Sequence, residues 1–346
     1  MILGAKDRIK GAWWGAFAAD ALAMPVHGYP TRDAIEKDYG YIVDMAAPKE
    51  PYRDFVLAGL NPPEFPKELD FIGSRRQIWR NPDTHPHRGL KAGDNTLPMI
   101  LALHLAAQIA ADGGFNFDNW MARYKAVMTN ESLQPDTFVP SIHRKYFENL
   151  LKGLPPEKNG CAEAHISDFI IFLPIFLCSY FRQKDMQNAI FRAIKVFSVG
   201  ENSLNSALFV MEIMSKLVAG SKLEKVLFEQ MNPDRHYALA YPYRRWIKAA
   251  NDDESMAELI GRTAELEKSI VLSIYLALKY GSDYESAMIA NANIGGETTG
   301  RGALAGSFIA AQYGMKAIPS RWLDSLARSA EIAGCLNAML SEISAV

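Results

Sequence analysis

The chain has 346 residues, of which 49% are hydrophobic and 22% charged, and it carries a formal net charge of −2. This ordinary globular composition, without a basic excess, argues against nucleic acid or a membrane surface as the main partner. No apolar run resembles a transmembrane helix or a signal peptide, and three scattered cysteines are too few for a disulfide framework or a zinc site. We therefore expect a cytoplasmic protein with reduced thiols and one or two domains.

The N-terminal segment 7–20 is rich in small and apolar residues and predicts a helix that ends before Met24-Pro25. Gly11 and Gly15 lie four residues apart in it, so one face of the helix is small enough to pack closely against another helix. Asp20 near its end is a candidate acid, although a lone carboxylate at a helix end is more often structural. His27 follows the proline in a loop, where a lone histidine is usually structural or exposed to solvent.

The segment 28–92 shows no long helical pattern, because its many prolines preclude helices other than a short one at 32–38. A compact domain seldom keeps so long an irregular segment without a use, so we expect it to cover a functional site. The alternative is a partly disordered insertion, against which its aromatic residues argue. His85 and His87 form a basic cluster with Arg88. Zinc would need a third ligand in register with the two histidines, and none is visible.

Helical patterns dominate the remainder of the chain. The turn 93–96 (Gly-Asp-Asn-Thr) opens a predicted helix through residue 111, with Asp94 or Asn95 as its N-cap. Further helices are predicted at 117–129, 141–152, 166–180, 184–197, 203–219, 222–230, 253–261, 264–280 and 282–293, and one or two more at 319–339. Glu163 and His165, just before the apolar helix at 166–180, could be cap residues or site residues. With no strand pattern, repeat or dividing linker after residue 93, we predict a single all-α domain of residues 1–346.

The stretch 291–306 combines a glycine pair, a carboxylate, two hydroxyls and an arginine before a helix of small residues that runs to residue 313. Gly295 and Gly296 allow positive φ angles and the close approach of another group. Glu297, Thr298 and Thr299 follow at a predicted helix N-terminus, where free N–H groups favour an anion or a polar ligand. Small residues four apart make one face of this helix, and the helix at 7–20 is the leading candidate for its packing partner.

Two acidic turns, 93–96 and 296–299, each open a predicted helix. If the turns face each other, Asp94 and Glu297 form a carboxylate pair that can hold a hard cation or act as acid and base at a glycosidic bond. The plainer alternative is that both carboxylates only cap their helices. Arg301 could bind a phosphate or a carboxylate, or pair with Glu297 one turn before it.

These motifs resemble those of the ADP-ribosylglycohydrolase family. The family's Asn-x-Gly-Gly-Asp-x-Asp-Thr, a Gly/Ala-rich helix and Ile-Pro-x-x-Trp-Leu are similar to residues 293–300, 302–306 and 318–323. Its Gly-Asp-Ala-Leu-Gly-x-Pro-x-Glu and Thr-Asp-Asp-Thr motifs resemble residues 19–27 and 93–96. The resemblance implies an orthogonal all-α helix bundle whose site lies where the motifs converge. It also implies two Mg²⁺ or Mn²⁺ ions and hydrolysis of the bond between ADP-ribose and an acceptor.

The chain departs from the family pattern at the metal ligands. Gly93 and Asn95 stand where the first turn of the family has threonine and aspartate, and Glu297, Thr299 and Gly300 replace two aspartates and a threonine in the second. His27 replaces the acidic residue after the proline. Only Asp94 and Glu297 remain as charged ligands. Divalent ions need oxygen ligands and charge compensation, so these replacements favour a metal-free site over one or two bound ions.

Two functions follow from the sequence. In the first, a glycoside hydrolase cleaves a ribosyl or related bond of a small-molecule or ADP-ribosyl-type substrate, with Asp94 and Glu297 as the acid/base pair and Asp20 in support. A cation, if bound, would lie on Asp94 and Glu297. The expected substrate-binding residues are Asn95, Thr96, Gly296, Thr298, Thr299, Arg301, His27, Glu163 and His165. The alternative is a catalytically inactive member of the family that binds a ligand or has a structural role.

Overall fold

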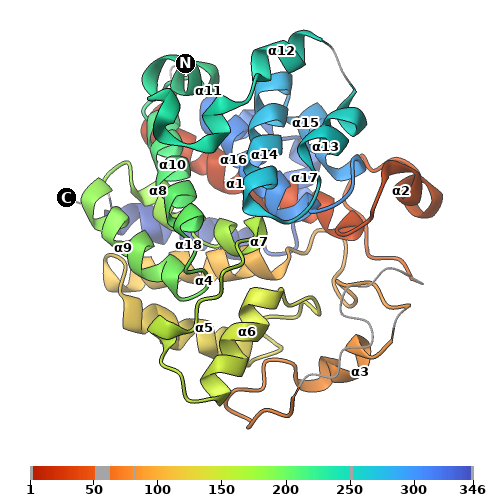
Figure 1. The fold of residues 1–346 in the computed structure, drawn as a ribbon, viewed down its shortest axis with the longest axis vertical. Helices are drawn as coiled ribbons and strands as arrows, with labels where there is room; N and C mark the ends of the chain where they lie inside the picture. The colour runs from red at the N-terminus through yellow and green to blue at the C-terminus, as the bar shows by residue number, and fades with distance from the viewer. Residues whose placement is uncertain (1–2, 51–62, 82, 250–251, 344–346) are drawn as a thin grey trace.

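The computed structural model describes residues 3–50, 63–81, 83–249 and 252–343, which form α-helices and connecting loops (Figure 1). These residues contain no β-strand, and two isolated bridges, Cys161–Ser198 and His165–Glu265, are their only β-type pairing. The prediction of an all-α fold is therefore confirmed. None of the helices in the described ranges is both long and apolar enough to cross a membrane.

The α-helices are α1 (Ala5–Ala23), α2 (Arg32–Tyr39), α3 (Arg76–Trp79), α4 (Leu97–Asp112), α5 (Phe117–Met128), α6 (Ser141–Leu151), α7 (Ile166–Ile170), α8 (Leu173–Cys178), α9 (Gln183–Lys195), α10 (Glu201–Val218), α11 (Leu223–Lys225), α12 (Tyr243–Lys248), α13 (Asp253–Ile260), α14 (Leu266–Tyr280), α15 (Tyr284–Asn293), α16 (Thr298–Tyr313), α17 (Ser320–Ser325) and α18 (Ser329–Ile343).

Some helices differ from the predicted ones. The single helix expected at 166–180 is divided into α7 and α8, because Pro174 has no N–H to continue the helical ladder and its ring would collide with the carbonyl of Ile170. The helix expected at 222–230 keeps α geometry only in α11 and continues as a π-helical turn, Val226–Gln230. The short helix α12, which follows Pro242, was not predicted.

Helices α1 and α16 form the centre of the molecule, and both are buried along most of their length. Their contact depends on glycine. A β-carbon at Gly15 would lie 2.7 Å from the carbonyl oxygen of Gly306, and a β-carbon at Gly306 would lie 2.7 Å from that of Gly15. The two backbones therefore touch, which confirms the predicted packing of the two small-residue faces.

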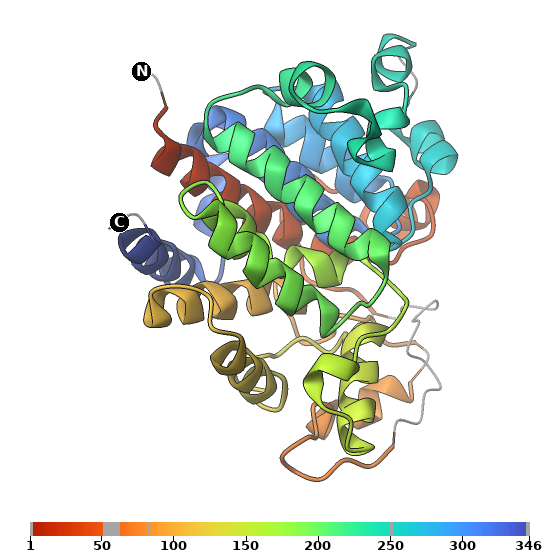
Figure 2. The ribbon, with the colours of Figure 1, turned by 60° about the vertical axis from the view of Figure 1, so that its left-hand side comes forward.

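The other long helices pack around this central pair. Helices α14 and α15 cover one side of α16, α10 also lies against it, and the short α7 crosses close to its N-terminal end. Helices α4 and α18 pack against each other, and both termini lie on the same side of the molecule (Figure 2). One contiguous cluster of buried side chains extends from α1 to α18.

The proline-rich segment predicted at 28–92 contains only the short helices α2 and α3 and a 3₁₀ turn, Gly73–Arg75, among its described residues. Residues 51–62 of this segment lie outside the described residues. Arg75 is buried and donates hydrogen bonds to the carbonyl oxygens of Phe71, Gln134 and Asp136. The indole of Trp79 donates to the carbonyl of Thr137 at 2.9 Å. These bonds fix the segment to the loop that precedes α6.

Candidate active site

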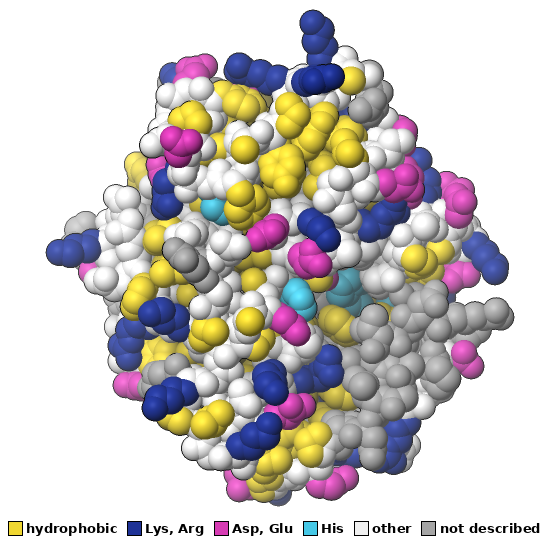
Figure 3. All heavy atoms as spheres, viewed as in Figure 1, with side chains coloured by type: hydrophobic (Ala, Val, Ile, Leu, Met, Phe, Trp, Pro, Cys, Tyr) yellow, Lys and Arg dark blue, Asp and Glu magenta, His cyan; other side chains and the backbone are white. Residues whose placement is uncertain are grey.

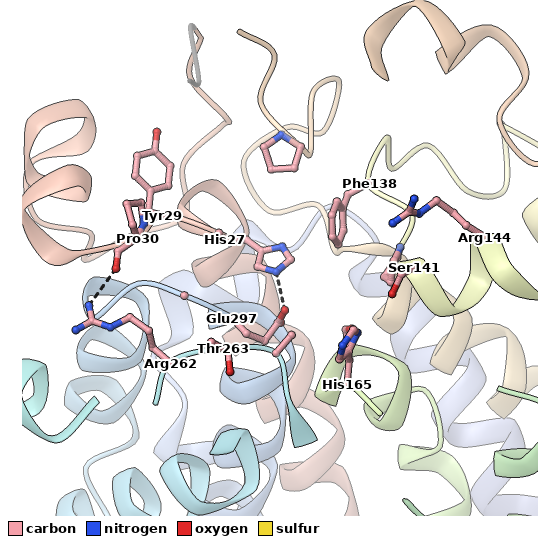
Figure 4. Close-up of a pocket in the computed structure, with 16 residues that line it drawn as sticks. His27, Tyr29, Pro30, Phe138, Ser141, Arg144, His165, Arg262, Thr263 and Glu297 are labelled. Carbon is pink, nitrogen blue, oxygen red and sulfur yellow. Dashed lines mark hydrogen bonds and ion pairs between the residues drawn. The ribbon is translucent and has the colours of Figure 1, made fainter. Parts of the chain in front are cut away.

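A cavity of about 480 Å³ lies beside the N-terminus of α16. Figure 4 shows His27 pointing onto Glu297 at its centre, Tyr29, Pro30 and Arg262 on one side, and Phe138, Ser141 and Arg144 on the other. Pro86 and Pro140 add apolar surface, and His165 and Thr263 add polar groups. On the outer surface, histidine side chains are visible between acidic ones near the middle of the face in Figure 3. Because its walls come from six separate segments, the cavity exists only in the folded chain.

The glycine pair Gly295–Gly296 places Glu297 at the cavity. Both glycines have φ of +73°, a region that other residues rarely adopt. The backbone of Gly296 exchanges two hydrogen bonds with the 28–29 segment: its N–H donates to Tyr29 at 2.7 Å, and its carbonyl accepts from Gly28 at 2.9 Å. The N–H of Glu297 donates to the carbonyl of Arg262 at 2.8 Å. The turn is thus joined to the residues that follow α1 and to the loop before α14.

Glu297 is the N-cap of α16 and is 6% exposed. Its Oε1 accepts from the N–H of Gly300 and from the hydroxyl of Thr299, each at 2.9 Å, while its Oε2 lies 2.8 Å from Nε2 of His27. Burial alone would raise the pKa of this carboxyl group. The charge of His27 and the hydrogen bonds outweigh burial and lower the pKa to about 2. The carboxylate is therefore ionised in the cavity wall.

A chain of buried hydrogen bonds continues from Glu297 through two histidines to Asp136. His27 Nδ1 lies 2.6 Å from His87 Nε2, and His87 Nδ1 lies 2.8 Å from Asp136 Oδ1. Asp136 also accepts from the backbone N–H of Leu97, the first residue of α4, at 2.8 Å. Together with the contact between Glu297 and His27, these make three side-chain hydrogen bonds, and each needs one proton between its two atoms. Two neutral imidazoles supply only two protons, so the complete chain holds one more.

The extra proton is assigned to His27. Burial works against a charged imidazole, but the nearby carboxylates of Glu297, Asp136 and Asp20 outweigh it and raise the pKa of His27. His87 then accepts at Nε2 and donates from Nδ1. His85 stands outside this chain: its Nε2 faces the carbonyl of Pro25 at 2.9 Å, and burial lowers its pKa to about 3. In the sequence, His27 appears as a lone loop histidine, and His85 and His87 appear as a basic cluster with Arg88.

Asp20, Asn95 and Thr96 come together behind the cavity and do not line it. Asp20 accepts from the Thr96 hydroxyl at 2.6 Å, and from the Thr96 N–H and the Asn95 side-chain amide at 2.9 Å each. Burial raises the pKa of Asp20, and these hydrogen bonds oppose the rise. The cluster joins the C-terminal end of α1 to the N-terminal end of α4.

Asp94, the predicted partner of Glu297, does not line the cavity either. Its Oδ2 accepts from the N–H of Lys91 at 2.8 Å and so closes its own turn. The N-cap of α4 is Thr96, and neither Asp94 nor Asn95 has that place. The carboxylate pair expected from the two turns is thus not brought together at this cavity.

Arg301 and Thr298 are structural in this arrangement. Arg301 is fully buried and donates to the Asn291 side chain at 2.7 Å and to the carbonyl of Gly295 at 3.0 Å. Burial lowers its pKa to about 9. The guanidinium supports the glycine turn from inside the protein instead of facing a ligand or forming an ion pair with Glu297. The hydroxyl of Thr298 donates to the carbonyl of Ala23 and ties α16 to α1.

His165 lines the cavity, whereas Glu163 lies at its edge, where it accepts from the hydroxyl of Ser141 at 2.9 Å. The backbone at His165 is held by an isolated bridge to Glu265: the N–H of Ile166 donates to Ala264, and the N–H of Leu266 donates to Ala164. Among the predicted site residues, the cavity therefore collects Glu297, Gly296, His27 and His165.

Several residues of the site carry no recognised motif in the sequence. Asp136, which ends the hydrogen-bonded chain, and Phe138 and Arg144, which line the cavity, lie in a loop or near a helix start. His87 was noted only as part of the basic cluster with His85 and Arg88. Arg262 also lines the cavity, and its guanidinium donates hydrogen bonds to Glu254 at 2.6 Å and to the carbonyls of Ile294 and Pro30 at 2.9 and 3.2 Å.

The residues at this site do not fit a divalent cation. No group of three or more His, Cys, Asp or Glu side chains suited to a metal ion occurs in the described part of the chain. Both oxygens of Glu297 already face protein donors, and the nearest of these is the imidazole of His27. Asp94 is turned to its own loop. A hard cation would have to displace several of these hydrogen bonds and compete with a charged imidazole.

Comparison with known proteins gives consistent matches over nearly the whole chain. A family model described as ADP-ribosylglycohydrolase matches residues 2–345. Crystallin J1A of Tripedalia cystophora is 21% identical over 339 residues, which cover 95% of this chain and 94% of that protein. Crystallin J1B of the same organism is 22% identical over 345 residues, 94% of each chain. A solved structure described as an ADP-ribosylglycohydrolase-related protein complex matches with a TM-score of 0.63 and 20% identity, over 98% of this chain and 99% of that one. At this identity, the structural match supports the fold alone.

Proposed function

Because this chain belongs to the ADP-ribosylglycohydrolase family, we propose that it hydrolyses a ribosyl or related glycosidic bond of a substrate bound in the cavity beside α16. The observation that carries the proposal is the ionised carboxylate of Glu297, which lines the cavity. Departure of a leaving group from a sugar leaves positive charge on the ring. A carboxylate fixed beside the ring lowers the free energy of that charged transition state.

The cavity suits a small-molecule or ADP-ribosyl-type substrate. Its volume of about 480 Å³ lies in the range of roughly 300–1,000 Å³ that is typical of small-molecule sites. Phe138, Tyr29 and the surrounding prolines offer flat apolar surface, while Ser141 and His165 offer groups that can bind hydroxyls. This combination of apolar walls and a few polar groups is what a ribosyl group with an attached ring requires.

The proposed reaction uses the protein's own charges. His27 holds the carboxylate of Glu297 in one orientation and keeps it ionised, and His87 and Asp136 in turn hold His27. The positive charge beside Glu297 is thus the imidazolium of His27, which belongs to the protein itself. No step is assigned to a divalent cation, because the donor set does not fit one.

The second candidate is a binding or structural role without catalysis. It is favoured by the similarity to two proteins that are named crystallins. It is also compatible with the hydrogen bonds that occupy both oxygens of Glu297. In that case the cavity would still bind a ligand, and the Glu297 side chain would serve only as a helix cap.

Turnover measurements with two conservative variants separate these functions. The substrates are ADP-ribosylated peptides and 4-nitrophenyl ribosides. We expect Glu297→Gln to lower kcat by about 10²–10³, the usual effect of removing one fixed charge-stabilising group. Asp94→Asn is the matched control, and we expect it to stay within about threefold of the wild type, because Asp94 does not line the cavity. A thermal melt of each variant shows that it folds.

Other outcomes contradict the proposal in different ways. Loss of turnover in Asp94→Asn with little change in Glu297→Gln would make Asp94 the essential acid. Absence of turnover by the wild type across the panel, together with ligand binding in calorimetry, would leave the binding role.

A further inference from the structure

A buried carboxyl group, Asp168 in α7, lies behind His165 and has no hydrogen-bond donor among the described residues. Its side chain is 5% exposed, and neither carboxyl oxygen forms a hydrogen bond. Its nearest polar neighbours are two imidazoles: His143 Nε2 lies 3.4 Å from Oδ1, and His165 Nδ1 lies 3.9 Å from Oδ2. An unsatisfied buried carboxyl group is costly, so its position between two histidines calls for a reason.

His165 separates this carboxyl group from the cavity. Its Nδ1 is the ring nitrogen that faces Asp168, which leaves Nε2 for a molecule in the cavity. The side chain is 26% exposed, and Figure 4 shows it below Ser141 and beside Glu297. The bridge to Glu265 fixes its backbone. One imidazole thus has a buried acid on one side and the proposed substrate site on the other.

The groups behind Asp168 favour a proton on the carboxyl. His143 is fully buried, its Nδ1 lies 2.8 Å from the hydroxyl of Tyr124, and burial lowers its pKa to about 3, so this imidazole is neutral. Burial raises the pKa of Asp168 well above the ordinary value, and the negative charges of Glu297 and Glu163 raise it further. Glu297 shows the opposite shift. Two carboxyl groups whose pKa values are driven apart are the arrangement that supplies an acid and a charge-stabilising base at one site.

We propose that His165 donates the proton that the leaving group needs, and that Asp168 supplies this proton through the imidazole. This inference rests on the proposed glycoside hydrolysis and names its acid. His165 is then the catalytic residue, because its Nε2 faces the substrate, and Asp168 is a positioning residue that acts through His165. The relay requires the distance of 3.9 Å between Nδ1 and Oδ2 to shorten when substrate binds, as catalytic hydrogen bonds commonly do.

The proposed step balances in protons and electrons. The bond between the anomeric carbon and the leaving-group atom breaks, and its electron pair passes to the leaving group. That atom takes the proton on Nε2 of His165, while Nδ1 takes the proton of Asp168. The sugar cation beside Glu297 then adds water, whose released proton goes to Nε2 as the Nδ1 proton returns to Asp168. The sum is substrate plus water giving the free sugar and the protonated leaving group.

A pair of substrates with the same ribosyl group and different leaving groups tests the relay. 4-Nitrophenolate leaves readily without a proton, whereas an alkoxide, as in a methyl riboside, needs one. We expect His165→Gln to lower kcat on the methyl riboside by about 100-fold or more and to have a much smaller effect on the 4-nitrophenyl riboside. Asp168→Asn should show the same difference in kcat between the two substrates, with an unchanged KM. His104→Gln is the matched control, since His104 lies on α4 and does not line the cavity.

Chemical rescue and Glu297→Gln complete the design. Free imidazole should restore turnover of the methyl riboside by His165→Ala, which a merely structural loss would not permit. Glu297→Gln should lower turnover of both substrates. Equal losses on the two substrates in His165→Gln, or no loss, would overturn the relay while the proposed function stands. Absence of turnover by the wild type on both substrates would overturn both.

Discussion

Glu297 and His27 lie 2.8 Å apart although 270 residues separate them in the sequence. Each fixes the charge of the other. Against the effect of burial, the imidazole lowers the pKa of Glu297, and the carboxylate raises the pKa of His27. The site therefore has an ion pair whose two members depend on pH in opposite directions.

The ion pair predicts how stability varies with pH. The pKa of Glu297 is depressed from 4.5, so its contribution is present above pH 4.5 and is lost as the pH falls towards 2. The pKa of His27 is raised above 6.5, so its contribution is complete below pH 6.5 and is lost as the pH rises through the folded-state value. Above pH 6.5 we therefore expect the wild type to lose more unfolding free energy than His27→Gln. Urea unfolding at a series of pH values measures both. Parallel curves for the two proteins would show that His27 is not charged in the folded state.

The contact between α1 and α16 predicts a large effect of one methyl group. A β-carbon at Gly15 would lie 2.7 Å from both the Gly306 carbonyl oxygen and the Ala310 side chain. We expect Gly15→Ala to destabilise the protein by about 1–3 kcal/mol or more, because the helices must separate. Gly334→Ala, in the middle of α18, meets no atom within 4 Å and should be neutral or stabilising by roughly 0.5–1 kcal/mol. Unfolding free energies of both variants test this, and equal values would mean that the helices do not touch at Gly15.

The donor set predicts indifference to divalent cations. Both oxygens of Glu297 face protein donors, and one of these is the imidazole of His27. We expect calorimetric titration with Mg²⁺ or Mn²⁺ to give no saturable heat at millimolar concentrations, and EDTA to change neither the melting temperature nor turnover. A saturable heat that disappears in Glu297→Gln would instead identify this carboxylate as a metal ligand.

The parts of the fold that the sequence predicted depend on local patterns. The spacing of Gly11, Gly15 and Gly306 indicated which helices touch, because glycines on one helix face let a second helix approach closely whatever the rest of the fold. The division between α7 and α8 could have been predicted as well, since Pro174 interrupts the helical ladder regardless of its surroundings.

The residues of the site were harder to predict from the sequence, because the direction of each side chain in the fold determines which of them reach the cavity. Asp94 and Glu297 occupy similar turns, yet Asp94 closes its own loop while Glu297 reaches the cavity. Arg301 follows the same turn as Glu297, and only the fold shows that its guanidinium faces backbone carbonyls. His87 contacts His27 and Asp136, which come from distant segments, and no periodicity or spacing marks it. Asp168 is marked only by its position three residues after His165.

The two hydrogen bonds between Gly296 and the 28–29 segment separate the charged part of the site from the rest of the cavity wall. They make the residues around His27 and those around Glu297 a single rigid unit at the junction of α1 and α16. Other parts of the cavity wall, including Phe138 and Arg144, belong to other segments. Substitutions in those parts of the wall should therefore change the shape of the cavity and leave the Glu297–His27 ion pair intact.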